Sequence, residues 1–173
     1  LKAIKKIKPD IIFFPHWSWL VPEDILNEFT CICFHMTDLP YGRGGSPLQN
    51  LISKGHTDTK LSALKMTKQL DSGAVYLKAP LSLQGSAQQI FDRCAVLTFE
   101  MITSIINLEP IPIEQSGEVT TFTRRKPEQS EIKGYETIIE LYDLIRMMDA
   151  ESYPKAYIYH NDIKLTLENV QLS

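Results

Sequence analysis

The sequence predicts an α/β fold in which an open parallel sheet is followed by a small carboxyl-terminal α+β unit. Two short apolar runs, Ile11–Phe14 and Thr30–His35, are typical of strands buried on both faces. A helix start at Pro22 lies between them, and the order strand, helix, strand is typical of parallel pairing. Pro110 and Pro112 then mark a linker, after which the predicted elements become shorter.

Composition limits what the chain can be. Its 173 residues, 43% of them hydrophobic and 23% charged, fit one folded domain with a small appendage. No apolar run approaches the roughly 18 residues of a membrane span, so we expect no membrane partner. Three cysteines without a signal peptide favour a reducing, cytoplasmic location. The 18 basic and 21 acidic residues give a net charge of −3, which excludes a broad basic field.

The remaining elements follow from local patterns. The chain opens on the amphipathic second half of a helix, so it is expected to begin within a fold. Ser86 and Gln89 form a capping-box pattern ahead of a long amphipathic helix. The other predicted elements are a short helix capped by Ser46 and ending at Ile52, strands at 59–66, 74–83 and 119–123, a helix at 135–148, and a hairpin of strands 156–159 and 163–167.

These elements divide the chain into three parts. Residues 1–109 form a core that is incomplete at its amino terminus, residues 110–118 form the linker, and residues 119–173 form the small subdomain.

One cluster invites a metal interpretation. Cys31, Cys33 and His35 lie two residues apart and would share one face of a strand. A strand rises about 3.3 Å per residue, so the outer two side chains stand roughly 13 Å apart, too far to share a zinc ion. We therefore expect no metal, and favour buried strand cysteines.

His35 differs because it ends a predicted buried strand where the chain enters a loop rich in Pro and Gly. In open α/β sheets ligands bind beyond the carboxyl ends of strands. An adjacent parallel strand ending near Asp71 would place its carboxylate beside the imidazole. Taken singly, each residue has a simpler interpretation, a satisfied core histidine and a turn aspartate. Together they predict acid/base chemistry.

These residues also carry a resemblance to a known family. The segment 34–47, with its histidine, Leu-Pro, Arg-Gly and Pro, resembles the signature of the 10-formyltetrahydrofolate-dependent formyltransferases. More narrowly, it is similar to methionyl-tRNA formyltransferases and their sugar N-formyltransferase relatives. Segment 70–74 is similar to the second signature, which contains the catalytic aspartate. Segments 122–130, 145–146 and 153–156 resemble the carboxyl-terminal marks of the same group.

The resemblance implies a Rossmann-like formyltransferase sheet that lacks its amino-terminal strands, and an enzyme that moves a formyl group from 10-formyltetrahydrofolate to a primary amine. By the same resemblance, His35 would stabilise and protonate the developing oxyanion or the leaving nitrogen. Asp71 would keep His35 charged and help to take up the proton of the amine.

The resemblance also assigns binding residues. Trp19, Leu20 and Val21, together with Leu70 and Asp71, would face the pterin of the folate. For Trp17 and Trp19, stacking on the ligand and core packing are equal alternatives. On the acceptor side, the expected residues are Arg43, Gly44, Arg124 and Arg125.

Cys33 departs from the family pattern, which has Asn two residues before the catalytic histidine. A thiol is a weak donor compared with an amide. In another enzyme the loss of one such donor lowers turnover about 10²–10³-fold, so a homologue that binds folate or nucleotide without turnover is an alternative.

For the acceptor, we favour a nucleotide-linked amino sugar, with methionyl-tRNA as the alternative. Only 55 residues follow the linker, and their seven basic and nine acidic side chains suit tRNA phosphates poorly. The basic residues 124–126 could bind a diphosphate, or they could form a solvent-exposed corner that binds nothing. A second copy of the chain, giving a homodimer, is a further expected partner.

Overall fold

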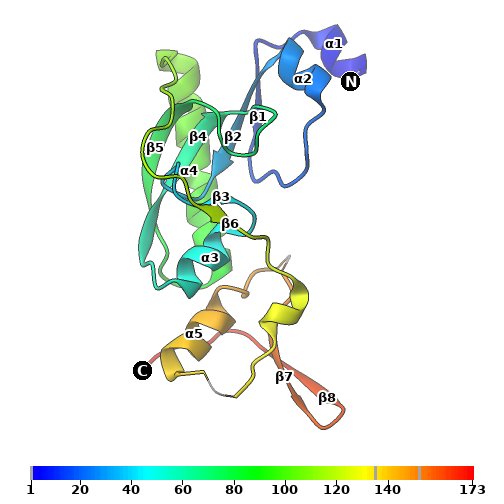
Figure 1. Cartoon of the computed structure of the whole chain (residues 1–173), viewed down its shortest axis with the longest axis vertical. Helices are drawn as coiled ribbons and strands as arrows, with labels where there is room; N and C mark the ends of the chain where they lie inside the picture. The colour runs from blue at the N-terminus through cyan, green and yellow to red at the C-terminus, as the bar shows by residue number, and fades with distance from the viewer. Residues whose placement is uncertain (1, 135, 152) are drawn as a thin grey trace.

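The computed structural model describes residues 2–134, 136–151 and 153–173, and it confirms the predicted α/β class. A four-stranded sheet carries the order β1-β2-β4-β5, with a small carboxyl-terminal unit below it in Figure 1. The strands of the sheet are β1 (Ile11–Phe14), β2 (Thr30–His35), β4 (Asp58–Lys65) and β5 (Val75–Ser82). The helices α1 (Lys2–Ile7) and α2 (Glu23–Glu28) flank β1 in the sequence, and the amino terminus lies at the upper end of the molecule.

Strand direction differs in part from the prediction. β1 and β2 are parallel, as expected, but β4 is antiparallel to both β2 and β5. The expectation that Asp71 follows a strand parallel to that of His35 is therefore wrong. The physical reason lies in the connections, because β4 reaches β5 through a short loop, which suits antiparallel neighbours, whereas parallel neighbours need a long crossover.

β1 is also less buried than predicted. All four of its residues are only half-buried, and within the described chain it pairs with β2 alone. β2 and β4 occupy the middle of the sheet, and their residues Cys31, Ile32, Leu61 and Leu64 are at most 1% exposed.

The helix α4 (Ala87–Leu108) packs against β4 and β5 and confirms the predicted capping box. Gln89 N donates to Ser86 Oγ (3.3 Å), and Ser86 N donates to Gln89 Oε1 (3.0 Å). Its buried face carries Ile90 and Met101 at helical spacing and closes the core under the sheet. None of the helices in the described residues has the length and apolar character needed to cross a bilayer.

Two short segments lie between these elements. The helix α3 (Pro47–Ser53) begins after Ser46 as predicted, but Ser46 does not cap it. Its backbone is left-handed (φ 50°), and its hydroxyl accepts from Arg125 N (3.0 Å). Before it, β3 (Arg43–Gly44) pairs in parallel with β6 (Thr121–Phe122), which is shorter than the predicted strand 119–123.

The carboxyl-terminal unit contains a 3-10 helix (Pro127–Ser130), α5 (Ile138–Arg146), and a hairpin of β7 (Ala156–His160) and β8 (Ile163–Leu167). Tyr135, the predicted start of the helix, lies outside the described residues. The unit docks on the core through buried hydrogen bonds. Arg146 donates to the carbonyls of Leu83 (2.6 Å) and Gly85 (3.0 Å), and Gln49 donates to that of Met147 (3.2 Å).

The residues 110–118 run along the core. Val75 N donates to Ile113 O (2.8 Å), and Ile113 N donates to Val75 O (2.9 Å). The segment therefore adds two ladder-like bonds beside β5. The domain boundaries given above stay a prediction.

The cap of α4 yields a stability test. Substitution Ser86→Ala removes the hydroxyl that accepts from Gln89 N, so we expect the free energy of unfolding to fall by about 1 kcal/mol. Urea denaturation followed by circular dichroism measures this. Ser104→Ala, a change within the same helix at a half-buried serine whose hydroxyl donates to Glu100 O, is the control and should have a smaller effect. Equal losses for the two variants would contradict a capping role.

Candidate active site

His35 stands at the end of β2 and is 8% exposed. Its Nε2 lies 2.8 Å from the carbonyl oxygen of Gly42. A carbonyl only accepts hydrogen bonds, so Nε2 carries a proton. The other ring nitrogen, Nδ1, lies 3.6 Å from Asp71 Oδ2, and the two side chains are 9% and 11% exposed. The structure thus brings together the two residues on which the predicted chemistry depends.

Asp71 reaches this position from the loop between β4 and β5. Its backbone is left-handed (φ 50°), a conformation that Asp tolerates better than most residues. Its Oδ2 accepts from Gly44 N (2.9 Å), so the carboxylate is held by both His35 and β3. Gly73 packs so closely on β4 that a Cβ would lie 1.9 Å from Lys65 O. Only glycine allows this close return of the loop toward the sheet.

The loop that follows β2 frames the imidazole. Asp38 pairs with Lys60 (2.9 Å) and Lys78 (2.5 Å), and Lys78 also donates to the carbonyl of Leu39. Gly42 N donates to Thr120 Oγ1 (2.7 Å), which fixes the peptide unit next to the carbonyl that receives His35.

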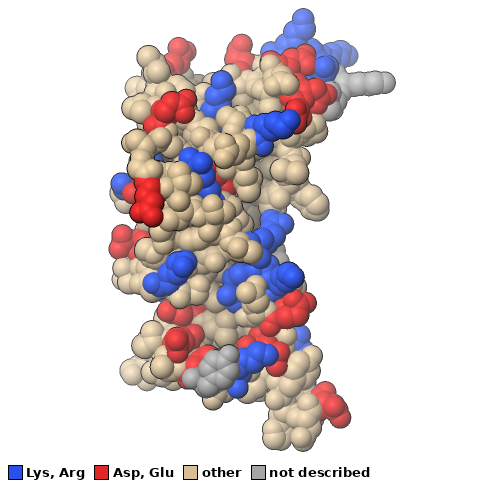
Figure 2. Space-filling model, viewed as in Figure 1, with Lys and Arg blue, Asp and Glu red and all other residues tan. Residues whose placement is uncertain are grey.

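The basic residues predicted to meet the acceptor are placed differently from one another. The Arg43 guanidinium donates to Gln115 Oε1 through Nε (3.1 Å) and Nη2 (2.7 Å). Arg125 is half-buried, donates to Gln129 O (2.6 Å), and burial lowers its pKa. Arg124 is exposed beside Gly45. Figure 2 shows Lys and Arg side chains gathered at the level of β6 and the loop after it.

Three of the five predicted folate residues lie on the surface. Trp19 is 76% exposed, Leu20 88% and Leu70 59%, whereas Val21 is half-buried. An ion pair between Lys68 and Glu23 (2.9 Å) joins the loop after β4 to the first turn of α2. For Trp19 the core-packing alternative is therefore wrong, because its side chain is mostly in solvent.

Cys33 lies two residues before His35 on β2. Burial, and after it the negative charge of Asp71, raises the pKa of its thiol to about 12. The thiol is therefore neutral at physiological pH. Among the described residues, no group of three or more His, Cys, Asp or Glu side chains is placed to hold a metal ion.

Gln115 is a site residue that sequence reasoning missed. Its Nε2 donates to the backbone carbonyls of Asp71 (2.8 Å) and Gly73 (2.9 Å). The sequence offers one indication of this role, which is that Gln115 is a polar residue within the predicted linker 110–118.

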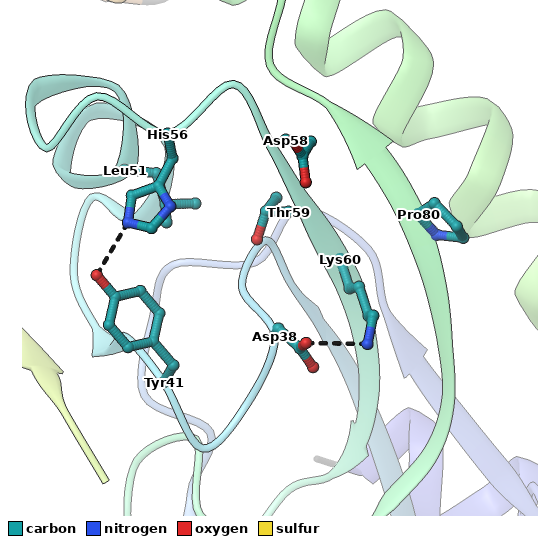
Figure 3. Close-up of a pocket in the computed structure, with 8 residues that line it drawn as sticks. All are labelled: Asp38, Tyr41, Leu51, His56, Asp58, Thr59, Lys60 and Pro80. Atoms are coloured by element: carbon teal, nitrogen blue, oxygen red, sulfur yellow. Dashed lines mark hydrogen bonds and ion pairs between the residues drawn. The ribbon is translucent and has the colours of Figure 1, made fainter. Parts of the chain in front are cut away.

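Two surface cavities lie away from this pair. One, of about 300 Å³, borders the loop after β2, and the other, of about 500 Å³, lies beside α5. Neither is lined by His35 or Asp71. In Figure 3 the hydroxyl of Tyr41 points toward His56 (3.1 Å), and Lys60 points toward Asp38. Two of the contacts that hold the loop after β2 therefore lie among the residues that line the first cavity.

The sheet with its buried His35–Asp71 pair has the fold of a formyltransferase. The solved methionyl-tRNA formyltransferase from Clostridium thermocellum is 46% identical, with a TM-score of 0.97 over 99% of this chain and 76% of that one. The chain belongs to the formyltransferase family that contains the methionyl-tRNA formyltransferases.

Other comparisons agree with this family. Residues 127–173 match the family described as "Methionyl-tRNA formyltransferase, C-terminal domain". The methionyl-tRNA formyltransferase of Rickettsia prowazekii is 32% identical over 94% of this chain and 55% of its own length. The chain thus spans about half the length of the curated relatives that it matches.

More distant structures share the fold alone. HypX from Aquifex aeolicus in complex with tetrahydrofolic acid is 16% identical, with a TM-score of 0.77 over 97% of this chain and 30% of that one. A 4-N formyltransferase from Francisella tularensis is 20% identical, with a TM-score of 0.74 over 99% of this chain and 76% of that one.

The raised pKa of Cys33 predicts slow labelling of its thiol. At pH 8 the folded protein keeps this proton, so Cys33 should react with iodoacetamide at least about 10²-fold more slowly than in guanidinium. Peptide mass spectrometry measures the rate. Asp71→Asn removes the second cause of the shift, so labelling should become faster.

The raised pKa of Cys33 also determines how this residue changes the free energy of unfolding with pH. Between pH 9 and about 12 the unfolded chain releases a proton that folded Cys33 keeps, so this contribution to the free energy of unfolding is lost as pH rises through that window. Fast reaction of Cys33 with iodoacetamide in the native protein at pH 8 would contradict the raised pKa of its thiol.

Proposed function

We propose that this protein transfers a formyl group from 10-formyltetrahydrofolate to a primary amine at the His35–Asp71 pair. The observation that carries the proposal is the 3.6 Å approach of His35 Nδ1 to Asp71 Oδ2 at the end of β2. Family membership supports the reaction class, and the fold shared with a protein solved with tetrahydrofolic acid supports the donor.

The reaction assigns a role to each group. The amine nitrogen attacks the formyl carbon, and the carbonyl oxygen becomes an oxyanion. Collapse of this intermediate breaks the bond to N10 of the folate and leaves a formamide. The amine loses one proton and N10 gains one, so the exchange balances. An imidazolium at His35 would stabilise the oxyanion by its charge and would supply its Nδ1 proton to N10, because Nε2–H is held by Gly42 O.

The surroundings of His35 favour this role. Gly42 O accepts from Nε2, so the neutral ring has its lone pair on Nδ1, facing the carboxylate of Asp71. The carboxylate of Asp71 therefore lies beside the nitrogen that exchanges a proton, where it can also receive the proton of the amine.

Cys33 limits the oxyanion site. Its half-buried side chain stands where the resemblance places Asn, and a thiol is a weak hydrogen-bond donor. Stabilisation of the oxyanion therefore rests on His35 and on backbone N–H groups. If these do not suffice, the protein binds its ligands without turnover, the alternative that the sequence raised.

For the acceptor, we propose methionyl-tRNA. Support comes from the 46% identity to the Clostridium thermocellum enzyme, against 20% for the 4-N formyltransferase. A nucleotide-linked amino sugar, which the sequence favoured, is the second candidate. The acidic balance of residues 119–173 supports it, since tRNA binding draws on phosphate neutralisation.

Removal of either acid/base group should abolish most turnover. We expect His35→Ala and Asp71→Asn each to lower kcat about 10²–10⁴-fold, because each removes a proton-transfer partner. Formation of formylated product and tetrahydrofolate gives the rate. His160→Ala, at an exposed histidine that ends β7, should leave the rate unchanged. Undiminished activity of folded His35→Ala would overturn the mechanism, and no turnover by the unaltered protein on either acceptor would leave the binding alternative.

The acceptors differ in their response to salt. Each phosphate neutralised adds about 0.9 to the slope of log affinity against log salt, so binding of methionyl-tRNA should weaken steeply. Arg124→Ala should reduce this slope by about 1, because its exposed guanidinium is free to meet a phosphate. Fluorescence anisotropy across a salt series measures both. A flat response, with saturable binding of a nucleotide sugar, would exclude tRNA in favour of the sugar.

A further inference from the structure

We propose that Gln115 is a positioning residue, which holds the Asp71 carboxylate in its place beside His35 by fixing the backbone of the loop that carries it. The expected effect of Gln115 on catalysis rests on the proposed function. The expected effect on the position of Asp71 rests on the hydrogen bonds of Gln115 alone. One side-chain amide joins three segments of the site: the loop after β4, the strand β3, and residues 110–118.

The orientation of the amide follows from its partners. Nε2 faces two backbone carbonyls, of Asp71 (2.8 Å) and Gly73 (2.9 Å), which can only accept. Oε1 faces the guanidinium of Arg43, which can only donate (2.7 and 3.1 Å). Both amide protons and both lone pairs of the oxygen are therefore used. A glutamate could satisfy Arg43 but has no proton for the carbonyls.

Asp71 needs this support because its backbone is in an unfavourable region. A non-glycine residue at φ 50° persists only where its surroundings fix it. The carboxylate accepts from Gly44 N, and the ring of His35 lies at 3.6 Å. The carbonyl of the same residue is fixed by Gln115. If that bond is lost, the peptide can rotate and the carboxylate moves away from His35.

Gln115 is itself fixed by the segment around it. Two residues earlier, Ile113 is bound to Val75 through both of its backbone groups. Within residues 111–119, Pro112 and Gln115 are half-buried and the other residues are exposed. Of the two, Gln115 contacts the loop of Asp71 and β3.

The contact also explains the position of Arg43. Its guanidinium, expected to meet the acceptor, is turned toward Gln115 through two hydrogen bonds. Arg43 and Gly44 are consecutive, and the backbone N–H of Gly44 binds the Asp71 carboxylate. Gln115 thus connects the side chain of Arg43 in β3 to the backbone carbonyl of Asp71. The carboxylate of Asp71 returns to β3 through Gly44 N, so these hydrogen bonds form a closed ring.

The test compares Gln115→Glu and Gln115→Ala with the unaltered protein. Gln115→Glu keeps the acceptor for Arg43 but places a carboxylate against two carbonyls, so we expect kcat to fall about 10²-fold with little change in KM. Combined with Asp71→Asn, it should cost nothing beyond Asp71→Asn alone, because both changes remove the same group from its place. A general structural defect would instead multiply the two losses.

A second measurement does not depend on turnover. The amide proton of Gly44 donates to a carboxylate, so its NMR resonance should move upfield in both Gln115 variants if Asp71 is displaced. Glu114→Ala, at the exposed neighbouring position, is the control and should leave this resonance and kcat unchanged.

The outcomes separate the two proposals. Absence of formyl transfer by the unaltered protein counts against the proposed function, and the Gly44 resonance then decides the role of Gln115. An unmoved resonance in folded Gln115→Ala, undiminished kcat in an active enzyme, or multiplied losses in the double variant would each overturn the positioning role.

Discussion

The hydrogen bond from His35 Nε2 to the carbonyl of Gly42 is the contact on which the site depends. It fixes which ring nitrogen carries a proton and leaves Nδ1 facing Asp71. The carbonyl is itself held in place, since the N–H of Gly42 donates to Thr120 Oγ1. A residue 78 positions away along the chain therefore determines how the imidazole meets its carboxylate.

Much of the fold could be predicted because it is encoded locally. The cap at Ser86 and Gln89 depends on residues three positions apart, and the hairpin of β7 and β8 on a short turn. The strands β1 and β2 are evident as apolar runs. The proximity of His35 and Asp71 was expected from two polar loops at strand ends and from family resemblance, although the strand direction used to argue it was wrong.

What escaped prediction depends on contacts between distant segments. A run of residues such as 59–66 shows its strand character but not the direction in which it pairs. Ser46 has the composition of a helix cap, yet its hydroxyl is taken by Arg125 N. Gln115 has no local pattern at all, because its four hydrogen bonds join it to three residues of β3 and of the loop after β4.

The two backbone hydrogen bonds between Ile113 and Val75 determine where the carboxyl-terminal unit could be exchanged for another. Residues 110–118 connect the core to the carboxyl-terminal unit and also supply Gln115 to the site. Recombination that exchanged the carboxyl-terminal unit at Pro110 would remove Gln115 together with its hydrogen bonds to Arg43 and to the loop after β4. A crossover after Phe122, where β6 has completed its pairing with β3, would keep these contacts.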